Sequence, residues 1–370
     1  RGVDPSATPV SDLRNRSFDR ILLIKPSSLG DVIHALPVLH GLRVRYPKAR
    51  IDWLIASPLA PLLAAVPELD EAVPFDRRRF GRLATDPVVV REFVGFVRRL
   101  RARRYELAVD LQGLFRTGFL SWASGAGVRV GLGSAREGAS VFYTHRLAVG
   151  DPESHAVDRN YLVAGLLGFE ELPVTFNLGI GDRARSDAAE LLDARDTNAA
   201  KRLVLVAPGA RWETKLWSPR RFAETIDRLH AGGTARCVLI GGAHDTAVCD
   251  RVAATCRRPP GNLAGRTDLQ QLPAVIEKAD LVLCHDSAAL HLAVALDRPV
   301  VCVIGPTNPR RTGPYRRPGD VVRLSLDCAP CYLRKLTACP HHHRCMADLD
   351  ADRVIEAAER ALNHHPAPPH

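Results

Sequence analysis

The sequence predicts an α/β protein of two domains, each built on a parallel sheet wound between helices. Three observations support this fold class. Short apolar runs alternate with segments of helical periodicity, and that alternation is typical of parallel sheets. The pattern pauses near residue 175 and restarts near residue 203. A length of 370 residues also fits two domains of ordinary size.

The first half contains six expected elements. Strands are expected at 21–24, 50–56, 106–111 and 127–133, and helices at 31–45 and 88–103. Residues 1–18 are polar and show no periodicity, so we expect a disordered lead-in there. The first folded domain then covers residues 19–175, an N-terminal Rossmann-like domain.

The second half repeats the pattern. Strands are expected at 203–207, 236–241, 281–284 and 300–304, and helices at 219–230, 269–279, 290–296 and 352–362. Glycine and proline residues gather between 168 and 181 and indicate the join between the halves. We expect a second Rossmann-like domain at 176–350, followed by a C-terminal helix and tail at 351–370.

The most informative stretch runs from Ala279 to Thr307. Its first apolar run ends in His285, Asp286 and Ser287, and a helical pattern follows. That helix would begin at the carboxyl edge of the sheet, where open α/β sheets bind ligands. Asp286 or Ser287 can cap it, and its free N–H groups would then bind a diphosphate. Many βαβ units share these features, and a lone histidine such as His291 is more often a core residue than a ligand.

Two further loops carry candidate chemistry. Asp31 follows the first strand, where it acts either as a helix cap or as a carboxylate that accepts a proton from a sugar hydroxyl. Lys215 lies in the loop 208–217 and would neutralise a leaving phosphate. Alternatively, Trp212 and Trp217 wedge the domains and Lys215 is a surface lysine.

Arginine supplies most of the positive charge. The net charge is +10, and only six residues are lysine. The arginine runs at 77–79 and 98–104 favour an anionic membrane surface or an acidic substrate, unless they are simply solvated helix faces. Nucleic acid is not expected as a partner, because no nucleic-acid-binding motif is present. Because no apolar stretch is long enough for a transmembrane helix and no signal peptide is visible, we expect a cytoplasmic protein.

Four of the nine cysteines are clustered near the carboxyl end. Cys328, Cys331, Cys339 and Cys345 have the spacing C-x2-C-x7-C-x5-C. Four thiolates on a short loop can hold zinc or iron at a structural site. A reduced, packed loop and a pair of disulfides are the alternatives.

Taken together, these segments resemble the lipopolysaccharide heptosyltransferases of glycosyltransferase family 9. The resemblance spans roughly residues 20 to 362, with the motifs in order in both halves. It is carried by residues 25–37, 110–114, 155–160, 208–210 with Lys215, 286–287 with His291, and 305–307. Segments 155–160 and 135–137 are more similar to heptosyltransferase I, and the cysteine-rich end is more similar to heptosyltransferase II.

The resemblance implies a GT-B architecture, with two Rossmann-like domains facing an interdomain cleft. It implies inverting transfer of heptose from ADP-heptose to the lipid A–Kdo inner core, with no cofactor or metal required for catalysis. Contact with the inner face of the cytoplasmic membrane is expected to be peripheral. The alternatives are a family member that uses another nucleotide sugar and a non-catalytic nucleotide- or metal-binding relative.

Site residues carried over by the resemblance fall into three groups. Asp31 matches the general base, and Lys215 matches the lysine that stabilises the diphosphate. The acceptor is expected at Arg116 and Arg136. The donor is expected at Ser28, Gly30, Pro208, Gly209, Lys215, Asp286, Ser287, Ala288 and His291. Ala288 departs from the family, which often has glycine there, and this bears on the identity of the sugar.

Overall fold

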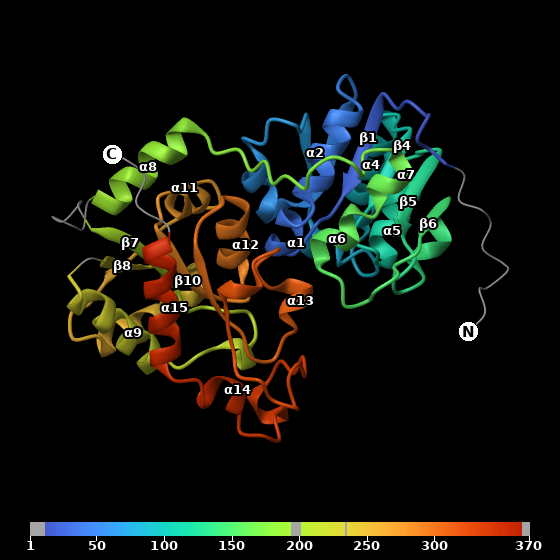
Figure 1. Ribbon diagram of the computed structural model, residues 1–370. Helices are drawn as coiled ribbons and strands as arrows, with labels where there is room; N and C mark the ends of the chain where they lie inside the picture. Colours follow the sequence, from blue (N-terminus) through green and yellow to red (C-terminus); the bar gives the residue numbers. More distant parts are fainter. Residues whose placement is uncertain (1–11, 194–200, 234, 365–370) are drawn as a thin grey trace. The chain divides into compact units, whose positions relative to one another are not determined.

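The computed structural model describes residues 12–193, 201–233 and 235–364 of the chain. The chain forms two compact units, Arg1–Gly179 and Ile180–His370 (Figure 1). Each unit has its own six-stranded sheet, and every strand pair in both sheets is parallel. The α/β class predicted from the sequence is therefore confirmed.

The sheet of the first unit has the strand order β3-β2-β1-β4-β5-β6. The central strand β1 is apolar and fully buried after its first residue, as expected for a parallel strand covered on both faces. The edge strands β3 and β6 have mixed burial, which explains why their sequences do not stand out. The strands are β1 (Arg20–Ile24), β2 (Arg50–Ala56), β3 (Glu71–Phe75), β4 (Leu107–Asp110), β5 (Val128–Leu132) and β6 (His145–Leu147).

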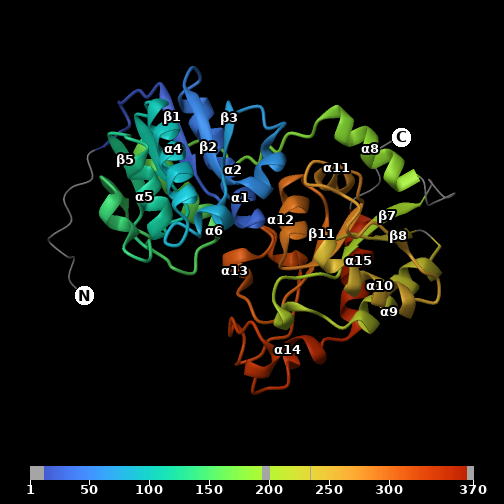
Figure 2. The ribbon, with the colours of Figure 1, turned by 180° about the vertical axis from the view of Figure 1, so that it is seen from behind.

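Helices cover this sheet, with α4 and α5 packed against Leu22 and Ile24 of β1. α2 contacts α6 and α7. The helices α2 and α6 are labelled in the view from behind (Figure 2). The helices are α1 (Leu29–Ile33), α2 (Leu36–Arg45), α3 (Arg77–Phe80), α4 (Pro87–Ala102), α5 (Phe115–Ala123), α6 (Ala156–Tyr161) and α7 (Val163–Leu167), with 3-10 turns η1 (Ser57–Leu63) and η2 (Ala139–Phe142).

The single helix predicted at 31–45 is wrong. The segment forms two helices, α1 and α2, separated at residues 34–35. Pro37 lies at the start of α2 and has no N–H to donate to the carbonyl of Ile33, so the helical hydrogen bonds are interrupted there. Val44, which the periodicity assigned to the apolar face, is 48% exposed.

The second unit repeats the strand order of the first, as β12-β11-β10-β7-β8-β9. Its strands are β7 (Arg202–Ala207), β8 (Ala235–Leu239), β9 (Gly261–Asn262), β10 (Leu281–His285), β11 (Val300–Val303) and β12 (Val321–Val322). Its helices are α8 (Asp182–Asp193), α9 (Pro219–Ala231), α10 (Thr246–Thr255), α11 (Gln271–Glu277), α12 (Ala288–Ala295), α13 (Pro309–Thr312), α14 (Arg344–Ala347) and α15 (Ala351–His364), with the 3-10 turn η3 (Glu213–Lys215) among its shorter elements.

The two ends of the described chain pack into these units. Leu13 and Phe18 are each 3% exposed, and the ring of Phe18 lies edge-on to Tyr46. The packed part of the first unit therefore includes residues within the expected lead-in at 1–18, of which 1–11 lie outside the described residues. At the other end, α15 contacts α9, β10 and β11 and joins the core of the second unit (Figure 1).

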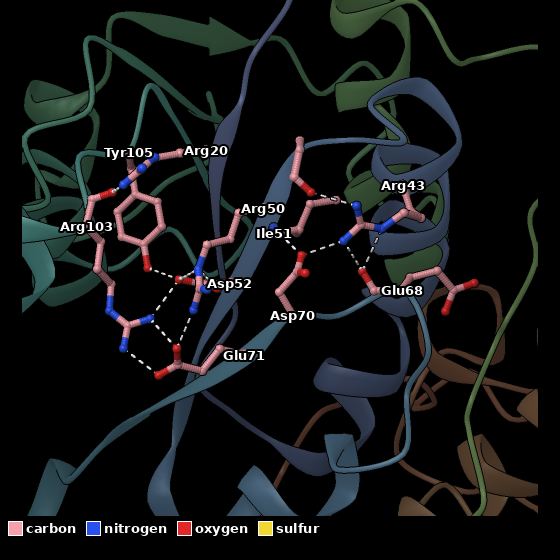
Figure 3. A network of polar contacts seen from close by, with 11 residues as sticks. Arg20, Arg43, Arg50, Ile51, Asp52, Glu68, Asp70, Glu71, Arg103 and Tyr105 are labelled. Carbon is pink, nitrogen blue, oxygen red and sulfur yellow. Dashed lines mark hydrogen bonds and ion pairs between the residues drawn. The ribbon is translucent and has the colours of Figure 1, made fainter.

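A network of charged residues ties together the amino ends of the strands in the first unit (Figure 3). The carboxylate of Asp52 is fully buried and accepts hydrogen bonds from Tyr105 at 2.6 Å and Arg103 at 2.7 Å. Arg103 also pairs with Glu71 at the start of β3, and Arg50 at the start of β2 pairs with both carboxylates. Arg103 belongs to the basic run at 98–104, so part of that run has a structural role rather than a free charge.

Candidate functional site

The strand order of each unit defines where a ligand is expected. In both sheets the order reverses between the first and fourth strands of the unit, β1 and β4 in the first and β7 and β10 in the second. Open α/β sheets bind ligands beyond the carboxyl ends of the strands at such a switch point. In each unit, a lysine from the loop after the first strand reaches the turn after the fourth strand.

In the second unit this lysine is Lys215. Its Nζ atom lies 2.8 Å from Oδ2 of Asp286 and donates to the main-chain oxygen of the same residue at 3.1 Å. Asp286 directly follows β10, and Lys215 ends η3 in the loop after β7. The side chains are 14% and 6% exposed, so the pair is largely desolvated. Lys215 is therefore not a surface lysine, and the fold brings it to the turn at Asp286.

Asp286 is the centre of a polar cluster. Its Oδ2 atom also accepts hydrogen bonds from the hydroxyls of Thr307 at 2.8 Å and Thr312 at 3.0 Å, and Nε2 of His291 lies 3.8 Å from Oδ1. Burial alone would raise the pKa of Asp286, but Lys215, His291 and the Thr307 hydroxyl together hold it below its usual value. Asp286 is thus a carboxylate that orients Lys215 and the surrounding hydroxyls.

The start of α12 differs from the expected capping. Ser287 is the N-cap residue, but within the described residues its side chain makes no capping hydrogen bond. The carboxylate of Asp286 is directed to Lys215 and the two threonines instead. Ala288 is the first residue of α12. The N–H groups of the first turn, at the positive end of the helix dipole, and the ammonium of Lys215 both lie at this edge.

The buried imidazole of His285 fixes the loop that carries Lys215. Its Nε2 atom accepts a hydrogen bond of 2.9 Å from the main-chain N–H of Trp217. Burial lowers the pKa of His285 to about 4, so the ring is neutral at neutral pH. Trp217 is 1% exposed and packs edge-on to Phe222 in the core of the second unit, which excludes a role as a wedge between domains.

Trp212 and Gly209 shape the same loop. The ammonium of Lys215 lies 4.6 Å from the centre of the Trp212 ring, and the guanidinium of Arg334 lies 4.9 Å from that ring. Gly209, next to Pro208 after β7, is in close contact with Asp245, because a Cβ atom at residue 209 would lie 2.2 Å from Oδ1 of Asp245. A larger residue at 209 would require the side chain of Asp245 to move.

In the first unit the candidate base is Asp31. It lies in the third position of α1, where its Oδ2 atom accepts hydrogen bonds from the N–H of Ser28 at 2.9 Å and from its hydroxyl at 2.8 Å. Asp31 therefore does contribute to the start of the helix. Its side chain is also 42% exposed, so it is accessible to a substrate. Gly30 is buried within α1, in helical conformation.

The lysine of the first switch point is Lys25. Its side chain is 8% exposed, with Nζ 3.6 Å from Oδ1 of Asp31 and 2.8 Å from the main-chain oxygen of Leu111, which it donates to. Leu111 directly follows β4. No pattern in the sequence assigns a role to Lys25; the available signal is a charged residue directly after a buried strand. Thr312 has no comparable signal, because its proximity to Asp286 depends on the fold.

The turn after β4 is held by Asp110. Its Oδ1 atom accepts hydrogen bonds from the N–H groups of Gln112 at 2.8 Å and Gly113 at 3.2 Å, and its Oδ2 atom accepts one from the hydroxyl of Tyr143 at 2.7 Å. Burial raises the pKa of Asp110, and these hydrogen bonds only partly oppose that effect. These hydrogen bonds of Asp110 fix the backbone of the turn after β4.

The two expected acceptor arginines come from neighbouring turns. The main-chain N–H of Arg136 donates to the oxygen of Gly113 at 2.8 Å, which joins the turn after β5 to the turn after β4. Arg116 is in the first turn of α5, and both arginines are exposed. Their backbones lie at the same sheet edge as Lys25. By contrast, Arg79 of the other basic run pairs with Glu92 at 2.7 Å.

The four-cysteine loop lies against the turn that carries Lys215. The main-chain oxygen of Leu333 accepts from the hydroxyl of Thr214, and Nε2 of His343 is 2.7 Å from the Thr214 oxygen. Cys328, Cys331, Cys339 and Cys345 line one cavity of about 140 Å³. All nine cysteines are free thiols, and burial together with the neighbouring sulfurs raises the pKa of Cys345 to about 11. Across the described residues, no group of three or more potential ligands is arranged to hold a metal ion.

Known proteins match this chain over most of its length. Residues 94–341 match the family described as glycosyltransferase family 9 (heptosyltransferase). The chain is 32% identical to lipopolysaccharide heptosyltransferase 1 of Pseudomonas aeruginosa over 341 residues, which cover 91% of this chain and 93% of the relative.

Two solved structures are similar in fold. ADP-heptose lps heptosyltransferase II of E. coli has a TM-score of 0.75 and 25% identity, with 94% of this chain and 100% of that one covered. E. coli heptosyltransferase WaaC with ADP-2-deoxy-2-fluoro heptose has a TM-score of 0.69 and 25% identity, with 92% and 99% covered.

Proposed function

Because this chain belongs to glycosyltransferase family 9, the heptosyltransferases, we propose that it transfers heptose from ADP-heptose to the lipid A–Kdo inner core of lipopolysaccharide. Its two Rossmann-like units are those of the GT-B architecture. The observation that carries the proposal is the placement of Lys215 with Asp286 and of Lys25 with Asp31 at the switch points of the two sheets.

In the proposed reaction the second unit binds the donor. The diphosphate is held by Lys215 and by the N–H groups at the start of α12, with Ser287, Ala288 and His291 around it. These groups stabilise the negative charge that develops on ADP as the bond to heptose breaks. Fixed cationic groups can do this without a divalent metal ion, so the proposed mechanism is metal-independent.

The first unit provides the base for the acceptor. Asp31 takes the proton from the attacking hydroxyl while that oxygen forms the new bond to the anomeric carbon of heptose. ADP departs from the opposite face, so the configuration at that carbon is inverted. Arg116 and Arg136 bind anionic groups of the acceptor. Because the acceptor is a lipid, we propose peripheral contact with the inner face of the cytoplasmic membrane; among the described residues, no helix combines the length and apolar character needed to cross a bilayer.

For the four-cysteine loop we propose a reduced, structural role at the Lys215 turn. The contacts of Leu333 and His343 with Thr214 support it. Metal analysis of the purified protein is expected to find zinc and iron well below one equivalent. A stoichiometric metal that is lost in the Cys328→Ser variant would contradict this role and would revive the structural metal site.

The proposed function is tested by incubating the protein with ADP-heptose and two acceptors, then weighing the products by mass spectrometry. One acceptor is lipid A–Kdo without heptose, and the other already carries one heptose. Transfer to the first indicates heptosyltransferase I, and transfer to the second indicates heptosyltransferase II. Transfer only from another nucleotide sugar would point to a different donor, as Ala288 allows. ADP binding without any transfer would indicate a non-catalytic relative.

A further inference from the structure

We propose that Lys25 is a positioning residue for the general base: its buried ammonium holds the carboxylate of Asp31 in place and in the ionised form. This inference rests on the proposed function, because it concerns how the proposed base is prepared. It goes beyond that function because Lys25 is not among the residues expected to bind the donor or the acceptor or to act as the base.

The geometry around Lys25 is rigid. The residue directly follows β1, and its side chain is only 8% exposed. Its main-chain oxygen accepts a hydrogen bond of 3.2 Å from the indole N–H of Trp53, a fully buried side chain. Its Nζ atom donates to the oxygen of Leu111 at 2.8 Å. Both ends of the residue are therefore fixed to neighbouring strands of the sheet.

The two oxygens of Asp31 have different surroundings. Ser28 donates twice to Oδ2, whereas Nζ of Lys25 is nearest to Oδ1 at 3.6 Å. That separation is longer than a hydrogen bond but within the range at which an opposite charge stabilises a carboxylate. The positive charge of Lys25 thus favours the ionised form of the base.

Two other titratable groups, Asp110 and His34, lie near this edge of the sheet. Asp110 lies just before Leu111, but its carboxyl group is bound by Tyr143 and by the turn after β4. His34 follows α1 and packs edge-on to His155, with the ring centres 5.3 Å apart. The arrangement of Lys25 also parallels the second unit, where Lys215 spans the equivalent switch point to Asp286.

The test is the Lys25→Gln variant, because glutamine can still donate to the oxygen of Leu111 but carries no charge. We expect kcat/KM for transfer to fall at least about 10-fold, and the acid limb of its pH profile to move up by on the order of one pH unit. The dissociation constant for ADP, measured by calorimetry, should stay unchanged because the donor binds the other unit. Lys48→Met, which removes an exposed charge from the same unit, is the matched control and should leave the profile unchanged.

A second variant separates charge from packing. Lys25→Arg keeps a cation, so we expect its acid limb to stay at the wild-type pH even if kcat falls. If Lys25→Gln does not fold, Lys25→Arg alone decides, and a shifted limb in that variant overturns the inference. Loss of kcat in Lys25→Gln with an unmoved limb also overturns it and leaves Lys25 as a packing residue. Failure of the proposed function would be recognised separately, by near-normal transfer in Asp31→Asn.

Discussion

Nζ of Lys215 lies 2.8 Å from Oδ2 of Asp286, across 71 residues of sequence and between the strands β7 and β10 where the sheet order reverses. The carboxylate of Asp286 orients the ammonium of Lys215 and accepts hydrogen bonds from the hydroxyls of Thr307 and Thr312. We therefore expect substitution of Lys215 to weaken ligand binding and substitution of Asp286 to lower the stability of the protein.

Replacing Lys215 by alanine should weaken ADP binding by about 10-fold or more, because the diphosphate loses a charge-assisted contact. Calorimetric titration with ADP measures this. Lys278→Ala removes an exposed lysine from the same unit and is the matched control. Equal affinity in the wild type and in Lys215→Ala would remove Lys215 from the donor site.

Replacing Asp286 by alanine should mainly reduce stability. The change leaves the largely buried ammonium of Lys215 without its carboxylate, and breaking one side of such a pair costs roughly 3 kcal/mol. Urea unfolding at pH 7 measures the difference in the free energy of unfolding. A loss well under 1 kcal/mol would mean that the pair contributes little to the fold of this loop.

Adding EDTA should leave transfer intact, because fixed positive groups stabilise the leaving group in the proposed mechanism. Transfer assays with a mass-spectrometric readout measure this. A strict requirement for Mg²⁺ or Mn²⁺ would contradict the proposed donor site.

Asp31→Asn should reduce turnover by ~10²-fold or more while ADP still binds normally, because the carboxylate removes the proton in the proposed mechanism. The same transfer assay measures turnover. Near-normal turnover in this variant would reduce Asp31 to a helix cap.

The sheets were the most predictable part of this fold. β2 occurs at residues 50–56, as the apolar run indicates, and β10 and β11 begin at the expected residues. Long buried strands carry a strong signal because most of their residues are apolar. β9 and β12 have only two residues each, and β3 is half-exposed, so their sequences do not differ from those of loops.

The candidate site was predictable only in part. Asp31, Lys215 and Asp286 each follow a buried strand, and that position can be read along the chain. The partners of such residues cannot be read along the chain. The contacts of Lys25 with Leu111 and of Lys215 with Asp286 depend on the strand order, which the sequence does not show directly. The role of Arg103 in the Asp52 network has the same origin, because nothing in a run of arginines shows which one faces a buried carboxylate.

Acid should destabilise the second unit through His285. Its folded pKa of about 4 is below the ordinary value of about 6.5, so between those pH values the unfolded chain binds a proton that the folded protein does not. The free energy of unfolding should therefore fall as the pH drops from about 6.5 to 4, by roughly 3 kcal/mol.

The His285→Gln variant tests this, because its amide oxygen can still accept from the N–H of Trp217. Urea unfolding at several pH values should show a weaker pH dependence in this variant than in the wild type. His364→Gln, which changes an exposed histidine at the end of α15, is the control and should keep the wild-type slope. The same slope in all three proteins would mean that His285 does not control acid stability.

Substitutions in two groups of arginines of the first unit should change different properties. Arg116 and Arg136 should affect the acceptor KM, and Arg103 should affect the free energy of unfolding. Arg116 and Arg136 are exposed at the carboxyl edge of the sheet, so replacing both by alanine should raise the acceptor KM by about 10-fold. Rising salt should also raise the acceptor KM, since exposed charges are screened over ~8 Å near physiological ionic strength. Donor KM should change less.

Arg103 lies instead at the amino edge, where it pairs with the buried Asp52 and with Glu71. Arg103→Ala should lower the free energy of unfolding by roughly 2 kcal/mol and leave the acceptor KM nearly unchanged, because the loss is that of a partly buried pair. Unfolding and steady-state kinetics on both sets of variants separate the two roles. If Arg103→Ala raises the acceptor KM as much as the double variant, or if neither affects it, the acceptor is not bound at the edge that carries Arg116 and Arg136.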